Sequence, residues 1–463
     1  MVGGDLPRQR GRVCRGAGGR PPRPLGRALR GVRARRPRLR PLLPDGGPPP
    51  DRPAHGLRGD GGRPPPRHRR RAVRRRHRGR GRLGDAVCDG VRGGQPPGGL
   101  VTLSDLDLTG LRYRTSAGVF EDLQSACDSN PDLAAFEVIG ESEEGRPIAG
   151  VTLGYGPHLV TLVAGAHADE PVGPETLRTL VLEGLAARGW GAEGGGLGDL
   201  LERVTLRVIP HVNPDGEARN RAWIEAWDAG RPAESLGHYL RGRRRELPGR
   251  DIEFGYPDLR AENRAATAFL FDGPPVTLHA SLHGMGFSEG ALLLIEKRWL
   301  RTDRDTALRE GYARAATEAG LRLHDHDRGA EKGFRYGGPG FWSTPEGTAM
   351  QAHFLDLGDP DTASRFRRSS MEEAIHPARV DPPLCVVPEL PLFVLSAPHE
   401  GAPGVPETLL AFREAMPALV ERAAEGDDLS DAVERFGIRC LDLTTQVRIH
   451  LQMLDLALDA ALS

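Results

Sequence analysis

Cysteines, aromatic residues and long apolar runs are all scarce in this sequence of 463 residues. It has five cysteines, none of them at a paired spacing, and aromatic residues make up 5% of the chain. This pattern argues against a disulfide framework or a cysteine metal site and predicts a reducing, cytoplasmic environment. No apolar segment has the length of a signal-peptide core and none reaches about eighteen residues, so we expect neither secretion nor a membrane span.

Lysine and glutamate are absent from the first 100 residues. That segment has 27 Arg against six Asp, a balance of +21, whereas the remaining residues, with 36 basic and 57 acidic side chains, have a balance of −21. A run of Arg, Pro and Gly cannot bury enough apolar area to fold, so we predict that residues 1–100 are disordered. One interpretation is a nucleic-acid-binding arm, because clustered arginines attract phosphate. The other, which we favour, is mis-started translation with the genuine start near Val101.

One short segment carries the clearest chemical signal. An apolar run over residues 159–166 is followed by His167, by Glu170 three positions later, and then by Pro171 and a helical pattern. A strand that ends at His167 and a helix that begins near Pro171 would leave both side chains at the carboxyl end of the strand. Imidazole nitrogen and carboxylate oxygen are ligands of catalytic zinc. Two such residues also occur three apart by chance, but their position at a strand end favours a metal site.

A third ligand is expected from residues 275–283, another strand-like run with His279 inside it and His283 at its end. The two histidines are four residues apart and point to the same side of a strand, so periodicity does not choose between them. The glycines that follow His283 leave room for a metal and a substrate. We therefore favour His283 as the ligand and interpret His279 as a hydrogen-bonded residue of a buried strand.

Glu389 is a carboxylate inside an apolar run, residues 384–394. Unpaired carboxylates are almost never fully buried, so this position requires an explanation. A salt bridge to a buried arginine is one interpretation. The other is a general base in a dry cleft, which takes a proton from water beside a metal ion.

The stretch 324–327, His-Asp-His-Asp, also contains possible metal ligands. Its charged neighbours and its loop-like setting are typical of a solvated surface. We therefore interpret it as a surface loop and not as a metal site.

Beyond residue 100, strand-like runs alternate with helical patterns. Strands are expected at residues 136–140, 148–153, 158–164, 203–209, 275–283, 291–295 and 384–388, and the clearest helices at residues 172–187, 263–270 and 303–319. This alternation predicts a three-layer α/β/α sandwich around a mostly parallel mixed sheet, with the active site at strand carboxyl ends. Further helices are expected at residues 406–424 and 431–462. We expect a catalytic domain over residues 101–400 and a helical extension over residues 401–463.

Several segments, taken in order, resemble one protein family. They are residues 138–148 with Gly-Arg-Pro-Ile at their end, His167 with Glu170, residues 208–216 with Asn-Pro-Asp-Gly, and residues 251–257, 261–265, 281–284 and 388–390. Together they resemble the zinc metallocarboxypeptidases, or funnelins, and specifically divergent bacterial members. The resemblance runs from near Leu103 to near Pro398 and implies a zinc-carboxypeptidase-like version of the α/β fold.

The resemblance implies that His167, Glu170 and His283 bind one zinc ion and that Glu389 activates water as the general base. The implied function is zinc-dependent hydrolysis of an amide bond in a peptide or an acyl-amino-acid. Two alternatives stay open: a small-metabolite deacylase on the same zinc site, and a binding relative without catalysis. The complete set of ligands favours an enzyme. We expect no membrane partner, and nucleic acid only if the arginine-rich tail is genuine.

The resemblance to the family is weaker for the residues around the metal site. The resemblance implies an arginine after the Asn-Pro-Asp-Gly segment that holds the oxyanion, and both Arg219 and Arg221 lie there, so spacing leaves the choice open. Asn213, the first residue of a turn by its chemistry, would shape the substrate pocket. The positions of the family's Asn-Arg pair, which grips a C-terminal carboxylate, hold Glu253 and Phe254 in this chain. Glu253 would repel a carboxylate and could attract an amine.

The family also places a tyrosine over the substrate on a mobile loop. Tyr336, between Phe334-Arg and a glycine-rich stretch, is the candidate in this chain because glycines favour a mobile loop. The substrate itself is not specified by any of these residues.

Overall fold

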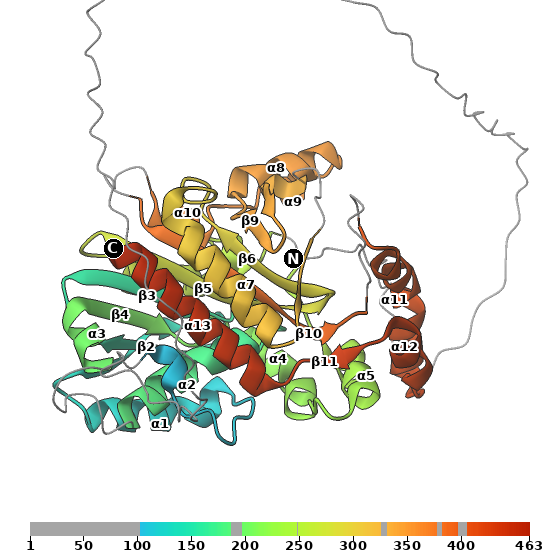
Figure 1. The fold of residues 1–463 in the computed structure, drawn as a ribbon, viewed down its shortest axis with the longest axis horizontal. Coiled ribbons are helices and arrows are strands. Elements are labelled where there is room, and N and C mark those ends of the chain that lie inside the picture. Colours follow the sequence, from blue (N-terminus) through green and yellow to red (C-terminus); the bar gives the residue numbers. More distant parts are fainter. Residues whose placement is uncertain (1–101, 187–196, 248, 326–330, 377–381, 397–404) are drawn as a thin grey trace, which may run out of the picture. The chain divides into compact units, whose positions relative to one another are not determined.

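The computed structural model describes residues 102–186, 197–247, 249–325, 331–376, 382–396 and 405–463 (Figure 1). The arginine-rich tail, residues 1–100, lies outside the described residues, and its disorder stays a prediction.

The centre of the fold is an eleven-stranded sheet, counted over the described ranges. Its neighbours follow the order β1-β2-β4-β3-β5-β10-β6-β9-β8, with β11 beside β10 and β7 beside β6. The strands are β1 (Ala134–Glu141), β2 (Pro147–Leu153), β3 (His158–Ala164), β4 (Val204–Ile209), β5 (Val276–Ser288), β6 (Gly290–Ile295), β7 (Arg322–Leu323), β8 (Tyr336–Gly338), β9 (Phe341–Ser343), β10 (Leu384–Val394) and β11 (Arg439–Cys440).

Parallel pairing occupies the centre of this sheet. Strands β4, β3, β5 and β10 all run in the same direction. β2 and β1 extend the sheet in antiparallel pairing on one side, and β6 is antiparallel to β10 on the other. Every residue of β10 is buried, which fits its unbroken apolar sequence, because a central strand is covered on both faces. The predicted α/β sandwich with a mixed sheet is confirmed.

Two central strands are longer than the sequence pattern indicated. β5 continues past His283 to Ser288, and β10 continues past Glu389 to Val394. The additional part of β5 still pairs with β10, from Gly284 with Leu390 to Ser288 with Val394. His283 and Glu389 therefore lie within strands and not at strand ends.

Helices cover both faces of the sheet. They are α1 (Ser116–Asp128), α2 (Val172–Ala186), α3 (Leu197–Arg203), α4 (Pro214–Glu225), α5 (Pro232–Gly242), α6 (Ala261–Phe271), α7 (Thr306–Glu318), α8 (Gly347–Asp356), α9 (Pro360–Ala363), α10 (Ser370–Ala374), α11 (Glu407–Glu425), α12 (Ser430–Phe436) and α13 (Leu443–Leu462). α1, α2, α7 and α13 share one hydrophobic cluster with the sheet, and α6 and α10 share a second cluster with its other face. None of the helices in the described ranges is long and apolar enough to cross a membrane.

Among the C-terminal helices, α13 joins the hydrophobic cluster of α1, α2 and α7, whereas α11 and α12 belong to a third cluster with α5 and the end of β10. Figure 1 shows α13 beside α7 across one face of the sheet, and β11 pairs with β10. The helix expected at residues 431–462 is two helices, because Gly437, with φ of 55°, ends α12 before β11. His450 of α13 is fully buried, and its Nδ1 lies 3.2 Å from the Thr176 hydroxyl of α2. The predicted boundary at residue 400 therefore does not separate two cores.

Candidate metal centre

The loop between β3 and α2 presents two of the predicted ligands. After β3 ends at Ala164, Gly165 takes a left-handed conformation with φ of 78°, and a side chain there would collide with the His211 ring. The chain then passes through His167 and Glu170 before α2 begins at Val172. Parallel pairing of β3 with β5 brings this loop next to the part of β5 that carries the third ligand.

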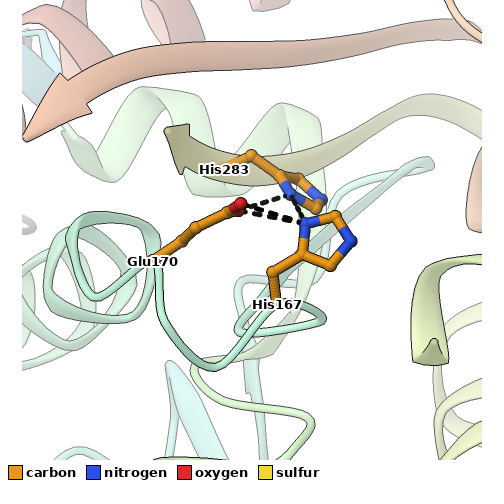
Figure 2. Close-up of side chains that lie close together, drawn as sticks. All are labelled: His167, Glu170 and His283. Atoms are coloured by element: carbon orange, nitrogen blue, oxygen red, sulfur yellow. Dashed lines mark hydrogen bonds and ion pairs between the residues drawn. The ribbon is translucent and has the colours of Figure 1, made fainter. Parts of the chain in front are cut away.

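Figure 2 shows the side chains of His167, Glu170 and His283 pointing toward one another. His283 Nδ1 lies 2.9 Å from Glu170 Oε2 and 3.1 Å from His167 Nδ1, and His167 Nδ1 lies 3.2 Å from Glu170 Oε2. One ligand atom from each residue lies within 4.8 Å of the others. Two imidazole nitrogens and one carboxylate oxygen directed at a common point form the donor set of a three-ligand zinc site. The residues therefore fit a zinc ion.

Each of the two histidine rings has a carboxylate next to its Nε2 atom. His167 Nε2 lies 3.0 Å from Asp251 Oδ2, and His283 Nε2 lies 3.2 Å from Glu253 Oε2. A carboxylate at Nε2 favours a proton on that nitrogen and leaves the Nδ1 lone pair for a metal. Sequence reasoning missed Asp251. The signal was available, because Asp251 begins the same segment, residues 251–257, that carries Glu253.

The charges of the site are strongly coupled. Burial opposes the charged form of His283, but hydrogen bonds to Glu170 and Glu253 outweigh it and raise the pKa of His283 to about 10. Burial likewise opposes a charge on His167, yet Glu170 and Asp251 hold its pKa well above the usual value. Protons therefore compete with a metal for the two Nδ1 atoms, and metal affinity should fall as the pH decreases.

Glu389 lies beside the three ligands on the neighbouring strand. It pairs directly with His283 in the register of β10 and β5, so both side chains project from the same face of the sheet. The carboxyl group is buried, and burial raises its pKa. The charge of Glu170 raises the pKa further, and the two histidines oppose that shift. A carboxyl group in this setting has the raised proton affinity that a general base requires.

Asn213 acts as a helix cap. Its side-chain oxygen accepts a hydrogen bond from Gly216 N at 2.9 Å, and Pro214 is the first residue of α4. The expected turn at Asn-Pro-Asp-Gly is therefore the start of a helix. Its amide nitrogen donates to Glu246 at 2.9 Å, and the whole residue is buried. These hydrogen bonds fix Asn213 at the start of α4, and its part in shaping the substrate pocket stays a prediction.

The two candidate arginines are engaged in ion pairs on α4. Arg221, on the solvent side of α4, pairs with Glu225 one turn later at 2.6 Å. Arg219 pairs with Glu144 at 2.6 Å and with Glu246 at 3.1 Å. The expectation that one of them holds the oxyanion stays a prediction.

Arg245 is the arginine that the structure brings to the metal loop. Its Nε lies 2.8 Å from Asp169 Oδ2, between the ligands His167 and Glu170. Burial lowers the pKa of Arg245, but Asp169 and then Glu170 outweigh that effect and keep it above its usual value. The residue lies in a stretch of three consecutive arginines, which gave no signal for choosing one from the sequence.

The structure gives the contacts of Tyr336 and Glu253, and the expectation that they face a substrate stays a prediction. Tyr336 lies on the edge strand β8, and its hydroxyl donates a hydrogen bond to Asp325. Glu253 is 2% exposed and directs its carboxylate at His283. Glu253 lies in a short 3-10 helix (Ile252–Phe254), and its carboxylate accepts a hydrogen bond from the Ser281 hydroxyl of β5. Its carboxylate therefore supports a metal ligand.

The two other histidine assignments can be compared with the structure. His279 is buried, with Nδ1 2.9 Å from the Thr161 hydroxyl, as expected for a residue of the strand interior. His324 is also buried, at 2% exposure, and pairs with Glu289 at 2.7 Å. The expectation of a solvated surface is wrong for His324, because strand β7 brings it under Trp342. His326 lies outside the described residues.

Comparison with known proteins identifies a similar family. The family model for zinc carboxypeptidases matches residues 120–268. Carboxypeptidase B of Astacus astacus is 27% identical over 155 residues, which are 33% of this chain and 48% of that protein. Carboxypeptidase D of Mus musculus is 30% identical over 168 residues, which are 32% of this chain and 12% of that protein. A solved metallo-carboxypeptidase from Burkholderia cenocepacia is 15% identical, with a TM-score of 0.36, over 73% of this chain and 68% of that one.

The chain spans about half the length, or less, of the curated relatives named above. The matched family region contains His167 and Glu170 but ends before His283 and Glu389. The family is one of zinc enzymes, and the three clustered side chains form the candidate site for that ion.

Proposed function

We propose that this chain, whose residues 120–268 match the family model for zinc carboxypeptidases, is a zinc-dependent hydrolase of amide bonds. The substrate class is a peptide or an acyl-amino-acid. The observation that supports this best is the convergence of His167, Glu170 and His283 on one point. Both histidines are held by carboxylates at their outer nitrogens, as is usual around catalytic zinc.

A zinc ion held by these three residues would supply Lewis acidity, which lowers the pKa of water and polarises a carbonyl group. Glu389 accepts the proton of the attacking water and can later donate it to the leaving amine. Its burial keeps the carboxyl group away from bulk solvent, and its position opposite His283 keeps it next to the reacting atoms. His283 and Glu389 are fixed by adjacent strands of the sheet, which makes their separation rigid.

Arg245 stabilises the negative charge that develops on the carbonyl oxygen. Its guanidinium is held on the metal loop by Asp169 at 2.8 Å, so it is oriented before a substrate arrives. This role replaces the one expected of Arg219 or Arg221. Arg243, whose Nε lies 3.8 Å from the same carboxylate, adds a second positive charge to this side of the site.

Deacylation of a small metabolite is the second candidate function. It is favoured by the positions that hold Glu253 and Phe254. Neither side chain is a cation that could bind a C-terminal carboxylate. Phe254 is buried against Met350 and Phe366, and Glu253 is engaged with His283. A zinc hydrolase of this kind would bind its substrate through other contacts.

The proposed function is tested by metal content and hydrolysis measured together. Elemental analysis of the full-length chain should give one zinc per chain, and a strong chelator should abolish hydrolysis until zinc is added back. A panel of peptides, blocked dipeptides and acyl-amino-acids separates peptidase from deacylase activity. Stoichiometric zinc without turnover of any panel member would contradict the proposal and favour a binding relative.

A further inference from the structure

Glu253 receives hydrogen bonds on both of its carboxylate oxygens. Oε1 accepts from the Ser370 hydroxyl at 2.9 Å and from the Ser370 backbone N–H at 3.3 Å. Oε2 accepts from the Ser281 hydroxyl at 3.1 Å and lies 3.2 Å from His283 Nε2. All four groups are buried. An ionised carboxylate is the side chain that can accept from all of them at once.

The short helix Ile252–Phe254 and the residue before it therefore provide one carboxylate to each of the two histidine ligands. Asp251, the residue before it, accepts from Glu253 N at 2.8 Å with one oxygen and faces His167 Nε2 with the other. Glu253 faces His283 Nε2. The two carboxylates, two residues apart, fix two different rings. Movement of this one helical turn would disturb both histidine ligands of the site.

We propose that Glu253 is a positioning residue for the metal site, which holds His283 in the tautomer that binds zinc through Nδ1. This inference rests on the zinc site of the proposed function, but not on its substrate. Ser370, the first residue of α10, fixes the far oxygen of Glu253 and so connects α10 to the metal ligand. Because both of its carboxylate oxygens are engaged in these contacts, Glu253 does not bind the substrate.

Replacement of the carboxylate by an amide has a specific consequence. The Ser370 N–H is a fixed donor, so the oxygen of a glutamine at position 253 would turn toward Ser370. The amide NH₂ would then face His283 Nε2 and the Ser281 hydroxyl, which itself lies 2.9 Å from that nitrogen. An NH₂ that donates to Nε2 favours the tautomer with the ring proton on Nδ1. That tautomer has no lone pair at Nδ1 for a metal. Glu253→Gln should therefore oppose zinc binding with almost no change in side-chain volume.

The test measures zinc retention in the full-length chain. Zinc-loaded wild type and Glu253→Gln are challenged with a chromophoric chelator, and their zinc affinities are compared. We expect a loss of about 10–100-fold for Glu253→Gln, the usual effect of removing a partner of a ligating histidine. Ser370→Ala should give a smaller loss in the same direction. Glu373→Gln, which alters a buried carboxylate of the same helix paired with Arg368, is the matched control and should retain wild-type affinity.

A second measurement separates positioning from general destabilisation. Nitrogen NMR of the histidine rings in the metal-free chain, at a pH above the His283 pKa of about 10 so that the ring carries one proton, should show that proton on Nε2 in wild type and on Nδ1 in Glu253→Gln. A folded Glu253→Gln variant with wild-type zinc affinity and an unchanged tautomer would overturn the proposal. If Glu253→Gln does not fold, wild-type affinity in Ser370→Ala would overturn it. Absence of hydrolysis with intact zinc binding would contradict the proposed function alone.

Discussion

Glu389 lies directly opposite His283 in the parallel pairing of β10 with β5. The candidate base and one candidate metal ligand thus come from neighbouring central strands, which are buried along their length. Their relative position is set by backbone hydrogen bonds and not by a loop. Because burial raises the pKa of Glu389, its proton affinity is higher than that of an exposed carboxyl group.

Replacing Glu389 by glutamine should remove the base without removing the metal. The substitution preserves the shape of the side chain, and Glu389 is not among the three clustered ligands. We expect Glu389→Gln to retain one zinc per chain and to lose about two to four orders of magnitude in kcat. Steady-state kinetics beside elemental analysis gives both quantities. Unchanged turnover would remove Glu389 from the mechanism.

The choice between the two histidines of β5 can be tested directly. His283→Ala removes one of three ligands and should abolish stoichiometric zinc binding. His279→Ala is the matched variant on the same strand and face. It should cost stability, about 1–3 kcal/mol, because the Thr161 hydroxyl loses its buried partner, while zinc stays bound. Zinc content measured after dialysis decides the matter, and full zinc in His283→Ala would exclude this ligand.

Much of the fold could be predicted from periodicity and turn chemistry. The apolar run before His167 predicted β3, and the helical pattern after Pro171 predicted α2, which ends at Ala186. Parallel strands place their carboxyl ends at one edge of a sheet, so the loop with His167 and Glu170 was expected beside the neighbouring strand. His283 was expected at the end of that strand but lies within β5, so its place among the ligands followed from the resemblance.

Side chains at a distance from the ligands could not be predicted in the same way. Arg221 and Arg245 both follow Asn213 in the sequence, but only the path of α4 and α5 determines which one returns to the metal loop. Glu253 occupies a position expected to face a substrate, yet hydrogen bonds from Ser370, 117 residues later in the chain, direct it toward His283. Contacts of this kind depend on tertiary packing that no local pattern encodes.

The first 100 residues should be dispensable for stability. A chain that begins at Val101 keeps the contacts of Leu103 and Ser104, whose backbone N–H groups donate to Asp455 of α13 at 2.8 and 3.0 Å. We expect it to have the Tm and the activity of the full chain. A chain that begins at Leu106 lacks these contacts and the buried Leu103, and should melt at a lower temperature. A lower Tm for the chain from Val101 would show that part of the tail contributes to folding.

Arg245→Ala should lower kcat rather than raise KM alone. If the guanidinium stabilises the developing oxyanion, its loss costs about 10²–10³-fold in kcat, the usual effect of removing one such donor. Arg221→Ala is the comparison, because that side chain is 61% exposed and pairs with Glu225 on its own helix. It should behave as wild type. A tenfold or larger effect of Arg219→Ala or Arg221→Ala, with Arg245→Ala unaffected, would instead support the expectation that one of those two arginines holds the oxyanion.

A free C-terminal carboxylate should gain little from this site. Glu253 is engaged with His283, and Arg260, a basic residue that follows that segment, is buried and pairs with Glu262 at 2.7 Å and Glu246 at 3.5 Å. Substrates with a free carboxylate and matched amidated substrates should therefore have similar kcat/KM. Kinetics on such pairs measures the preference. If the free acid is favoured by more than about tenfold, about 1.4 kcal/mol of transition-state binding, then Arg243 or Arg245 binds the carboxylate. Arg245→Ala would in that case raise KM for the acid and leave the amide unaffected.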